Sequence, residues 1–276
     1  MKAVNLIYGG LFVCASLIAS NYSALAAGSE IGGKLDVILS GSAAKIEAEG
    51  GKIHLGSVNL QGTKIGGNAK IVTDGKVTGT VKAAKEAEVN VASLYMENSE
   101  VMGNLKVDKL YGSATSITAE NKAEVHLGSA KITNSQFSGN LDIKTDGRVN
   151  GAITAKKDAK IHLASLSADK VKVLGGNASF DLGTTVAKVD ADPGSNVYLS
   201  AANLSNVTFN NGVDITTRST LGQVKAEKGA TVSIASAQLS NATFNGKVDL
   251  NLRASVPGGI TAKQGSKVEI GGFTML

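Results

Sequence analysis

Residues 105–127 read LKVDKLYGSATSITAENKAEVHL, and residues 141–163, thirty-six positions further on, read LDIKTDGRVNGAITAKKDAKIHL. The two stretches differ at most positions, yet their apolar residues occupy equivalent places. Three landmarks carry this period along the chain: a β-branched residue two before an alanine, an apolar–x–apolar triplet, and then a single apolar residue. The first landmark begins at Ile46, Val81, Ile117, Ile153, Val189, Val224 and Ile260. Seven copies spaced by 35 or 36 residues establish an internal repeat, and such a repeat determines the architecture.

The repeat unit is made of short strands. Triplets such as Val125-His126-Leu127 alternate apolar and polar residues, which is the period of a strand and not of a helix. Clusters of Gly, Asn, Asp and Ser separate the strands, and both prolines, Pro193 and Pro257, fall between them. This pattern favours an all-β fold, a parallel β-solenoid whose coils stack about 4.8 Å apart with equivalent side chains in ladders.

Each 36-residue unit has two halves that both contain an apolar triplet. We therefore expect two coils of about 18 residues per repeat, thirteen or so coils in all, and a rod roughly 60 Å long. The alternative is a β-propeller, whose blades usually run to about 40–45 residues and carry aromatic signatures, whereas this chain has no Trp. The recurring apolar positions should point into the core, and the polar positions between them should point outward. We therefore expect His126 and Asp142 to face solvent and the following residues, which we call the inward rows, to be buried: Ile117, Val125, Leu127, Phe137, Leu141 and Ile143.

The first 26 residues have the three parts of a secretory signal. Lys2 is the only charged residue, an apolar run follows it, and small residues lead to Ala24-Leu25-Ala26. We expect cleavage between Ala26 and Ala27, so that residues 27–276 form a single repeat domain that is secreted or held at the cell surface. The only cysteine, Cys14, lies in the leader. Apolar burial and backbone hydrogen bonds must therefore hold the mature chain together without disulfides.

Charge and hydropathy exclude several classes of partner. Without Lys2 the chain has 27 basic and 23 acidic residues, a net charge of +4, and both signs are scattered through every repeat. A nucleic-acid-binding face would cluster its Lys and Arg, so we expect no nucleic acid partner. No stretch after the leader is apolar over the roughly 20 residues that a spanning helix needs, so we expect no integral membrane span.

The sequence contains no recognisable catalytic, cofactor or metal site. His54, His126 and His162 all occupy the outward middle position of the same triplet. With two coils per repeat they would lie at least about 10 Å apart, too far to share one zinc ion, so we interpret them as residues of a solvated face. Carboxylates such as Asp142 and Asp214 recur at outward positions, but nothing marks a catalytic pair. We expect a protein that is not an enzyme and that carries no cofactor and no metal.

The rhythm of the mature chain resembles that of known β-solenoids. Residues 74–81, DGKVTGTV, and residues 146–153, DGRVNGAI, share a Gly-x-apolar-x-Gly pattern that is similar to bactofilins, β-helical proteins that polymerise end to end. Most of the mature chain also resembles the bacterial extracellular repeats of adhesins and haemagglutinins. The leader departs from the bactofilin pattern, because bactofilins are cytoplasmic. The resemblance implies a β-helical architecture, and a function only by analogy.

The two ends of the repeat array complement each other. The array opens on the second half of a unit, around Leu35 and Val37, and closes on the first half, around Val268 and Ile270, with Phe273 beyond it. We expect these five residues to mediate head-to-tail self-association, because uncapped solenoid ends recruit further strands.

These expectations lead to a functional hypothesis. The protein is an exported, non-enzymatic structural component of a cell surface or biofilm matrix that acts by end-to-end assembly into a filament, by adhesion, or by both. Its partners are further copies of itself and, for adhesion, a surface polysaccharide or another matrix protein. The alternative hypothesis is a β-helix that binds or cleaves polysaccharide, which a clustered acidic groove would favour.

Overall fold

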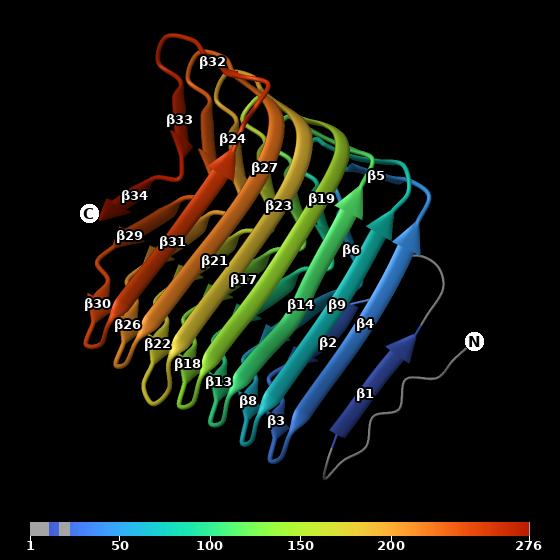
Figure 1. The fold of residues 1–276 in the computed structure, drawn as a ribbon. Coiled ribbons are helices and arrows are strands. Elements are labelled where there is room, and N and C mark those ends of the chain that lie inside the picture. The colour runs from blue at the N-terminus through green and yellow to red at the C-terminus, as the bar shows by residue number, and fades with distance from the viewer. Residues whose placement is uncertain (1–10, 17–22, 276) are drawn as a thin grey trace.

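The computed structural model describes residues 11–16 and 23–275, which wind into a parallel β-solenoid (Figure 1). A central coil consists of β19 (Leu141–Lys156), β20 (Lys160–Leu163), β21 (Leu166–Asp169) and β22 (Lys172–Val173), and β23 (Ala178–Ala191) begins the next coil. Within the described residues, no helix has the length and apolar character that crossing a membrane requires. The all-β class and the solenoid architecture predicted from the repeat are therefore confirmed.

Four parallel sheets form the walls, each built from equivalent strands of successive coils. The long sheet contains β1 (Leu11–Ser16), β4 (Leu35–Ala43), β5 (Ile46–Glu49), β9 (Ala69–Val77), β10 (Thr80–Ala84), β14 (Leu105–Ala114), β15 (Ser116–Glu120), β19, β23, β27 (Val213–Ala226), β31 (Val248–Ser255) and β32 (Ile260–Ala262). Short sheet 1 contains β6 (Lys52–Leu55), β11 (Glu88–Val91), β16 (Glu124–Leu127), β20, β24 (Asn196–Leu199), β28 (Thr231–Ile234) and β33 (Lys267–Ile270).

Two further short sheets complete each coil. Short sheet 2 contains β2 (Ser23–Ala27), β7 (Ser57–Gln61), β12 (Leu94–Glu97), β17 (Ala130–Thr133), β21, β25 (Ala202–Ser205), β29 (Ala237–Ser240) and β34 (Phe273–Met275). Short sheet 3 contains β3 (Glu30–Ile31), β8 (Lys64–Ile65), β13 (Glu100–Val101), β18 (Gln136–Phe137), β22, β26 (Thr208–Phe209) and β30 (Thr243–Phe244). The three short sheets lie on the opposite side of the coil from the long sheet.

The register corrects one prediction about the coil. Leu105 pairs with Leu141, and Val125 pairs with Ile161, so one coil takes up a whole 36-residue unit. The expectation of two coils per repeat is wrong, because the two triplets of a unit lie in different sheets of one coil, the long sheet and short sheet 1, and do not stack on each other. Short sheet 1 has seven strands, which at about 4.8 Å spacing makes a stack of about 30 Å, half the expected length. The propeller alternative is also wrong, since all strands stack along a single axis.

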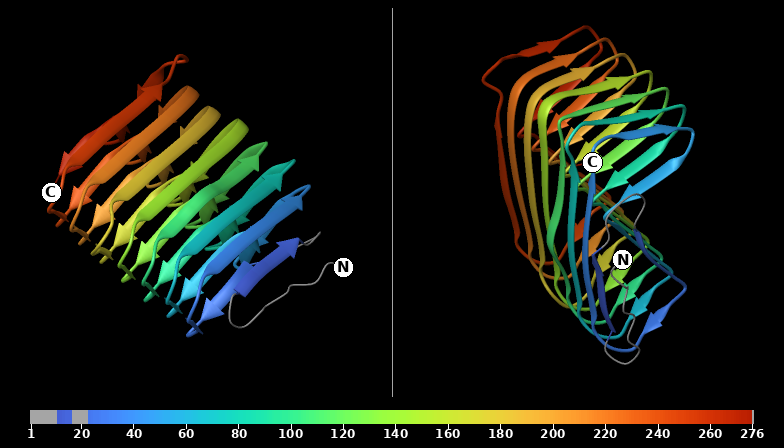
Figure 2. Two further views of the ribbon diagram at one scale, coloured as in Figure 1. Left: turned by 60° about the horizontal axis from the view of Figure 1, so that its bottom comes forward. Right: turned by 90° about the vertical axis from the view of Figure 1, so that its right-hand side faces the viewer.

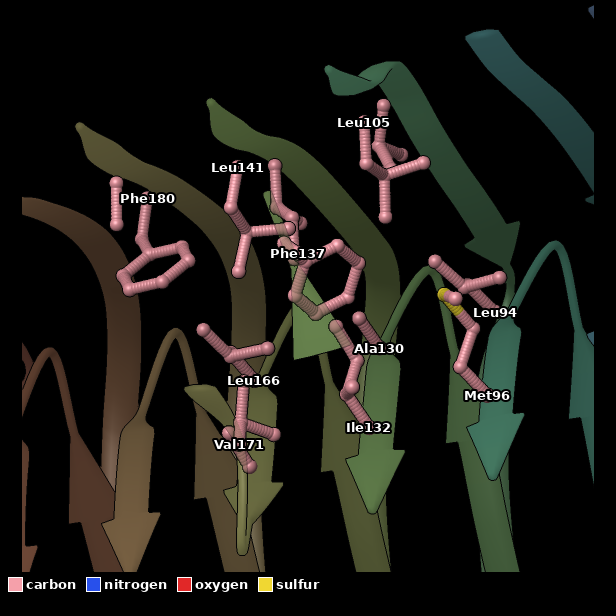
Figure 3. Close-up of a cluster of buried hydrophobic side chains, with 14 of the residues drawn as sticks. Leu94, Met96, Leu105, Ala130, Ile132, Phe137, Leu141, Leu166, Val171 and Phe180 are labelled. Atoms are coloured by element: carbon pink, nitrogen blue, oxygen red, sulfur yellow. The ribbon is translucent and has the colours of Figure 1, made fainter. Parts of the chain in front are cut away.

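Two apolar cores lie side by side within each coil. The first lies between the initial part of the long sheet and short sheets 2 and 3, and Figure 3 shows it around Phe137, Leu141 and Leu166. The second lies between the remainder of the long sheet and short sheet 1, around Ile153 and Ile161. All the predicted core residues are at most 2% exposed, which confirms the inward rows: Ile117, Val125, Leu127, Phe137, Leu141 and Ile143.

A narrow waist separates the two cores, and Figure 2 (right) shows the corresponding indentation of the coil outline. Here short sheet 1 turns into short sheet 2 through a residue in the left-handed region, for example Gly128 with φ 59° or Ala164 with φ 48°. The long sheet approaches this bend so closely that a Cβ on Gly112 would lie 2.6 Å from the Gly128 nitrogen. Thr145 Oγ1 donates a hydrogen bond of 2.8 Å to the Ala164 carbonyl across the waist. The small residues of the repeat thus place a bend at the same point in successive coils.

Candidate functional site

A groove lies outside the waist between short sheets 1 and 2, where residues of β6, β7, β11 and β12 line a hollow. Its floor is a column of buried serines: Ser57, Ser93, Ser129 and Ser165. Ser57 Oγ donates to the Asn90 carbonyl at 3.1 Å, and Ser93 Oγ donates to the His126 carbonyl at 3.2 Å. Both of these hydroxyls therefore bond to the following coil, which fixes the groove floor. One hollow in the groove is bordered by charged and aromatic side chains: Lys52, His54, Glu88, Tyr95 and Lys131.

The wall formed by short sheet 1 carries a column of polar and aromatic residues. Successive coils place the following side chains one above the other: His54, Asn90, His126, His162, Tyr198, Ser233 and Glu269. The rings of His126 and His162 stack with centroids 4.7 Å apart, and those of His162 and Tyr198 stack at 4.8 Å. The side chains of both histidines are nearly buried, with 11% and 12% of their surface exposed.

This arrangement corrects the interpretation of the histidines. His126 does lie on the outer side of its strand, as the alternation predicts, but the groove buries it, so it does not belong to a solvated face. His126 and His162 are one coil apart and in ring contact, because each repeat makes one coil. Asn90 lies between His54 and His126 in the column, so the structure does not bring the third histidine to the same place.

Glu124 joins the two stacked histidines. Its Oε1 atom lies 2.9 Å from His126 Nε2 and 3.6 Å from His162 Nε2. Sequence reasoning did not single out Glu124, although the signal was present in the alternation. Residues two apart in a strand share a face, so Glu124 and His126 had to lie together on the outer side of β16.

The electrostatics of this cluster set its charge state. The hydrogen bond from His126 lowers the pKa of Glu124 to about 2, in spite of the burial of the carboxylate. Burial of the imidazole, reinforced by the neighbouring His126, lowers the pKa of His162 to about 3. At neutral pH the cluster therefore holds an ionised carboxylate beside a neutral His162 ring. The remaining ring nitrogens, Nδ1 of His126 and of His162, each lie 3.4 Å from the hydroxyl of a floor serine, Ser129 and Ser165.

The second candidate site is the end face, which we define as the open side of the last described coil, residues 243–275. Its inward rows are apolar but only partly covered: Val268 and Ile270 are half-buried, Ile260 is 48% exposed and Phe273 is 47% exposed. In the central coils the equivalent rows are fully buried. Among the described residues, this row of apolar side chains therefore has neighbours on one side only.

The remaining predicted site residues lie at the opposite end of the solenoid (Figure 1). Leu35 and Val37 are buried in β4, and β1 pairs with that strand from Leu11↔Leu35 onward. Ala26 and Ala27 belong to β2, where they pair with Leu60 and Gln61 of β7. Cleavage between these two alanines stays a prediction. The structure does not bring the two groups of self-association residues together within one chain.

Comparison with protein-family models, with curated proteins and with solved structures finds no match for this chain. The solenoid architecture therefore rests on the strand pairing described above. The similarity to adhesin-type repeats and bactofilins is a similarity of sequence rhythm.

Proposed function

We propose that this chain is an exported, non-enzymatic structural protein that assembles end to end into filaments at a cell surface or in an extracellular matrix. The observation that carries the proposal is the partly covered apolar end face. Burial of apolar surface stabilises a protein by roughly 25 cal/mol per Å² removed from water, so an open core row favours association. Strand edges that lack a partner add unsatisfied backbone donors and acceptors, which recruit a further strand.

The occupant that fits this face is the first coil of a second copy. Ile46 stands in the same column of the repeat as Ile260, and Ile53 stands in the same column as Val268. A second copy placed on the end face would therefore extend both of these columns with a further β-branched apolar residue. The contact joins two different faces and does not close on itself, so it generates a filament. The Gly-x-apolar-x-Gly spacing that resembles bactofilins suggests the same end-to-end assembly by analogy.

The leader supplies a reason for assembly to follow export. The strand β1 pairs with β4, and β2 pairs with β7, so residues 11–16 and 23–27 occupy backbone edges that an incoming copy would need. Removal of residues 1–26 would uncover the edge of β4 and most of the edge of β7. In this proposal the uncleaved chain is held back from assembly and the cleaved chain is competent for it. Adhesion would follow from the resulting filament, as the adhesin-like rhythm suggests, with a surface polysaccharide or a matrix protein as a further partner.

The test compares molar mass by light scattering across a range of protein concentrations. We expect residues 27–276 to grow in mass with concentration and the full chain to remain small. The double variant Val268→Asp/Ile270→Asp should lower the association of residues 27–276 at least tenfold, since it puts two charges into the contact. The matched control is Thr118→Asp, an outward residue of a central coil, away from the end face, whose column already accepts Asp190. A cleaved chain that stays monomeric at high concentration contradicts the proposal.

A further inference from the structure

Two imidazole nitrogens and one carboxylate converge in the groove from adjacent coils. The ligand atoms of Glu124, His126 and His162 all lie within 4.8 Å of one another. Zinc binds His nitrogen at about 2.0–2.1 Å and carboxylate oxygen at about 2.0–2.2 Å, which sets neighbouring ligands of a tetrahedral site about 3.3 Å apart. The distances from Glu124 Oε1 to His126 Nε2 and His162 Nε2, 2.9 and 3.6 Å, lie on either side of that value.

We propose that Glu124, His126 and His162 form a binding site for a divalent transition metal ion of the zinc type, held by Nε2 of both histidines and by the carboxylate. Two neutral imidazoles and one carboxylate are a frequent donor set for zinc. The site links β16 to β20 and so bridges two adjacent coils. It is independent of the end-to-end assembly, because it lies in the middle of the solenoid.

Binding requires a modest change of the stacked rings. Their planes are 10° apart, so their Nε2 lone pairs point in nearly parallel directions. A shared ion needs the two rings to tilt toward each other about the Cβ–Cγ bond. This torsion joins an sp³ to an sp² atom and has a broad energy profile, so the tilt costs little.

The floor serines support the ligand role of both histidines. A metal-bound imidazole usually donates its other ring N–H to a neighbouring acceptor, which fixes the tautomer and the ring orientation. Nδ1 of His126 faces Ser129 Oγ, and Nδ1 of His162 faces Ser165 Oγ, each at 3.4 Å. A hydroxyl can accept from Nδ1–H or donate to a bare Nδ1, so the serines accommodate both the free and the metal-bound tautomer.

The charges around the cluster favour a transition metal over a hard cation. Glu124 supplies one negative charge, while the nearby Lys131 and Lys160 offset it. An ion attracted by charge alone would gain little there, whereas imidazole ligation favours zinc, copper and nickel. Magnesium requires octahedral oxygen ligands and should not bind.

The test is titration calorimetry of the full chain, stripped of metal with EDTA, using zinc chloride as the titrant. The protein carries Cys14→Ser, which removes the one thiol that could bind zinc elsewhere. We expect one zinc ion per chain with a Kd in the micromolar range or below, and no binding of magnesium. Zinc should also raise the melting temperature, because it binds the folded state.

The chain offers its own control variants. His126→Asn and His162→Asn introduce the residue that Asn90 already provides in this column, and Glu124→Gln keeps the shape of the side chain. Each should weaken zinc binding at least tenfold and abolish the zinc-induced rise in melting temperature. His54→Asn changes a histidine of the same column outside the cluster and should bind zinc as the parent does.

Three results would overturn the proposal. The first is the absence of saturable zinc binding in the parent protein. The second is binding that survives in both His126→Asn and His162→Asn when their melting curves show a folded protein. The third is an equal loss of binding in His54→Asn, which would place the site elsewhere along the column. As a positive signature, cobalt substituted for zinc should give the visible absorption of a tetrahedral site.

Discussion

The central coils and the last described coil contain the same kinds of residue in the same columns but differ in how far these are buried. Val125 and Leu127 are fully buried, whereas Val268 and Ile270, further along the same two columns, remain half-exposed. The strands that carry them, β16 and β33, have the same length and belong to the same sheet. Within the described part of the chain, a central coil is covered on both sides and the last described coil on one, which accounts for the difference in burial.

This contrast shows how stability is distributed in the solenoid. Each coil contacts only its neighbours, so the free energy of folding is approximately a sum of coil terms and interface terms. A substitution in a central coil disturbs two interfaces, and the same substitution in the last described coil disturbs one. Matched substitutions in one column can therefore measure the contribution of a single interface.

The largest expected effect is the difference between Leu127→Asp and Ile270→Asp, which lie in the same column. Burying an unpaired carboxylate between two coils costs several kcal/mol, or about 10 °C or more in melting temperature for a chain of this length. A carboxylate introduced at the half-exposed Ile270 can stay hydrated, so Ile270→Asp should lower the melting temperature by less than half as much. Thermal denaturation followed by circular dichroism checks this, and equal melting temperatures would contradict the interface picture. If Leu127→Asp does not fold, Leu127→Ala against Ile270→Ala gives the same comparison, with about 2–5 kcal/mol expected at Leu127.

A smaller effect should separate two threonines at the waist. Thr145 Oγ1 donates to the Ala164 carbonyl at 2.8 Å, whereas the buried hydroxyl of Thr217, in the same column, has no hydrogen-bond partner. Thr145→Val should cost about 1 kcal/mol, because it removes a net-stabilising hydrogen bond. Thr217→Val should be neutral or stabilising, because it removes an unsatisfied buried hydroxyl. Urea unfolding of the two variants measures both changes, and the reverse order would show that the waist bond does not contribute.

The smallest effect concerns outward positions, where the two regions should not differ. Thr118 in a central coil and Thr261 in the last described coil belong to a column that also holds Glu47 and Asp190. Thr118→Asp and Thr261→Asp should each change the free energy of unfolding by no more than about 0.5 kcal/mol, as is usual for surface substitutions. Chemical denaturation of both variants measures the change. A clear loss at Thr118 alone would mean that outward positions also depend on both neighbouring coils.

The inward rows could be read from the sequence because solenoid packing repeats one requirement in every coil. Val125 and Leu127 are predictable from alternation alone, and their equivalents confirm the row at 36-residue intervals. The path of the coil could not be read in the same way. Triplets such as Leu141/Ile143 and Ile161/Leu163 look alike whether they stack on each other in successive coils or lie in two different sheets of one coil. Only the pairing of Val125 with Ile161 decides between these arrangements.

Whether the histidine cluster can be predicted also depends on the number of coils in each repeat. With one coil per repeat, a 36-residue spacing places His126 and His162 in contact, and alternation adds Glu124. The burial of these side chains follows from the bend at the waist, which turns the outer side of short sheet 1 into a groove wall. Recurring pairs of small residues such as Ala164-Ser165 mark a bend after the strand, but the pattern does not show that the outer surface beside the bend is concave.

Because each repeat forms one coil, the number of repeats sets the length of the solenoid without changing its cross-section. In-frame recombination between repeats would add or remove about 4.8 Å of rod and leave the cross-section unchanged. The ladders, the waist and the groove would remain continuous after a repeat was lost or gained. A feature that needs two particular neighbours, as the contact of His126 with His162 does, would survive only if recombination spared that junction. Lineages could therefore vary the reach of the rod freely while this one junction stayed fixed.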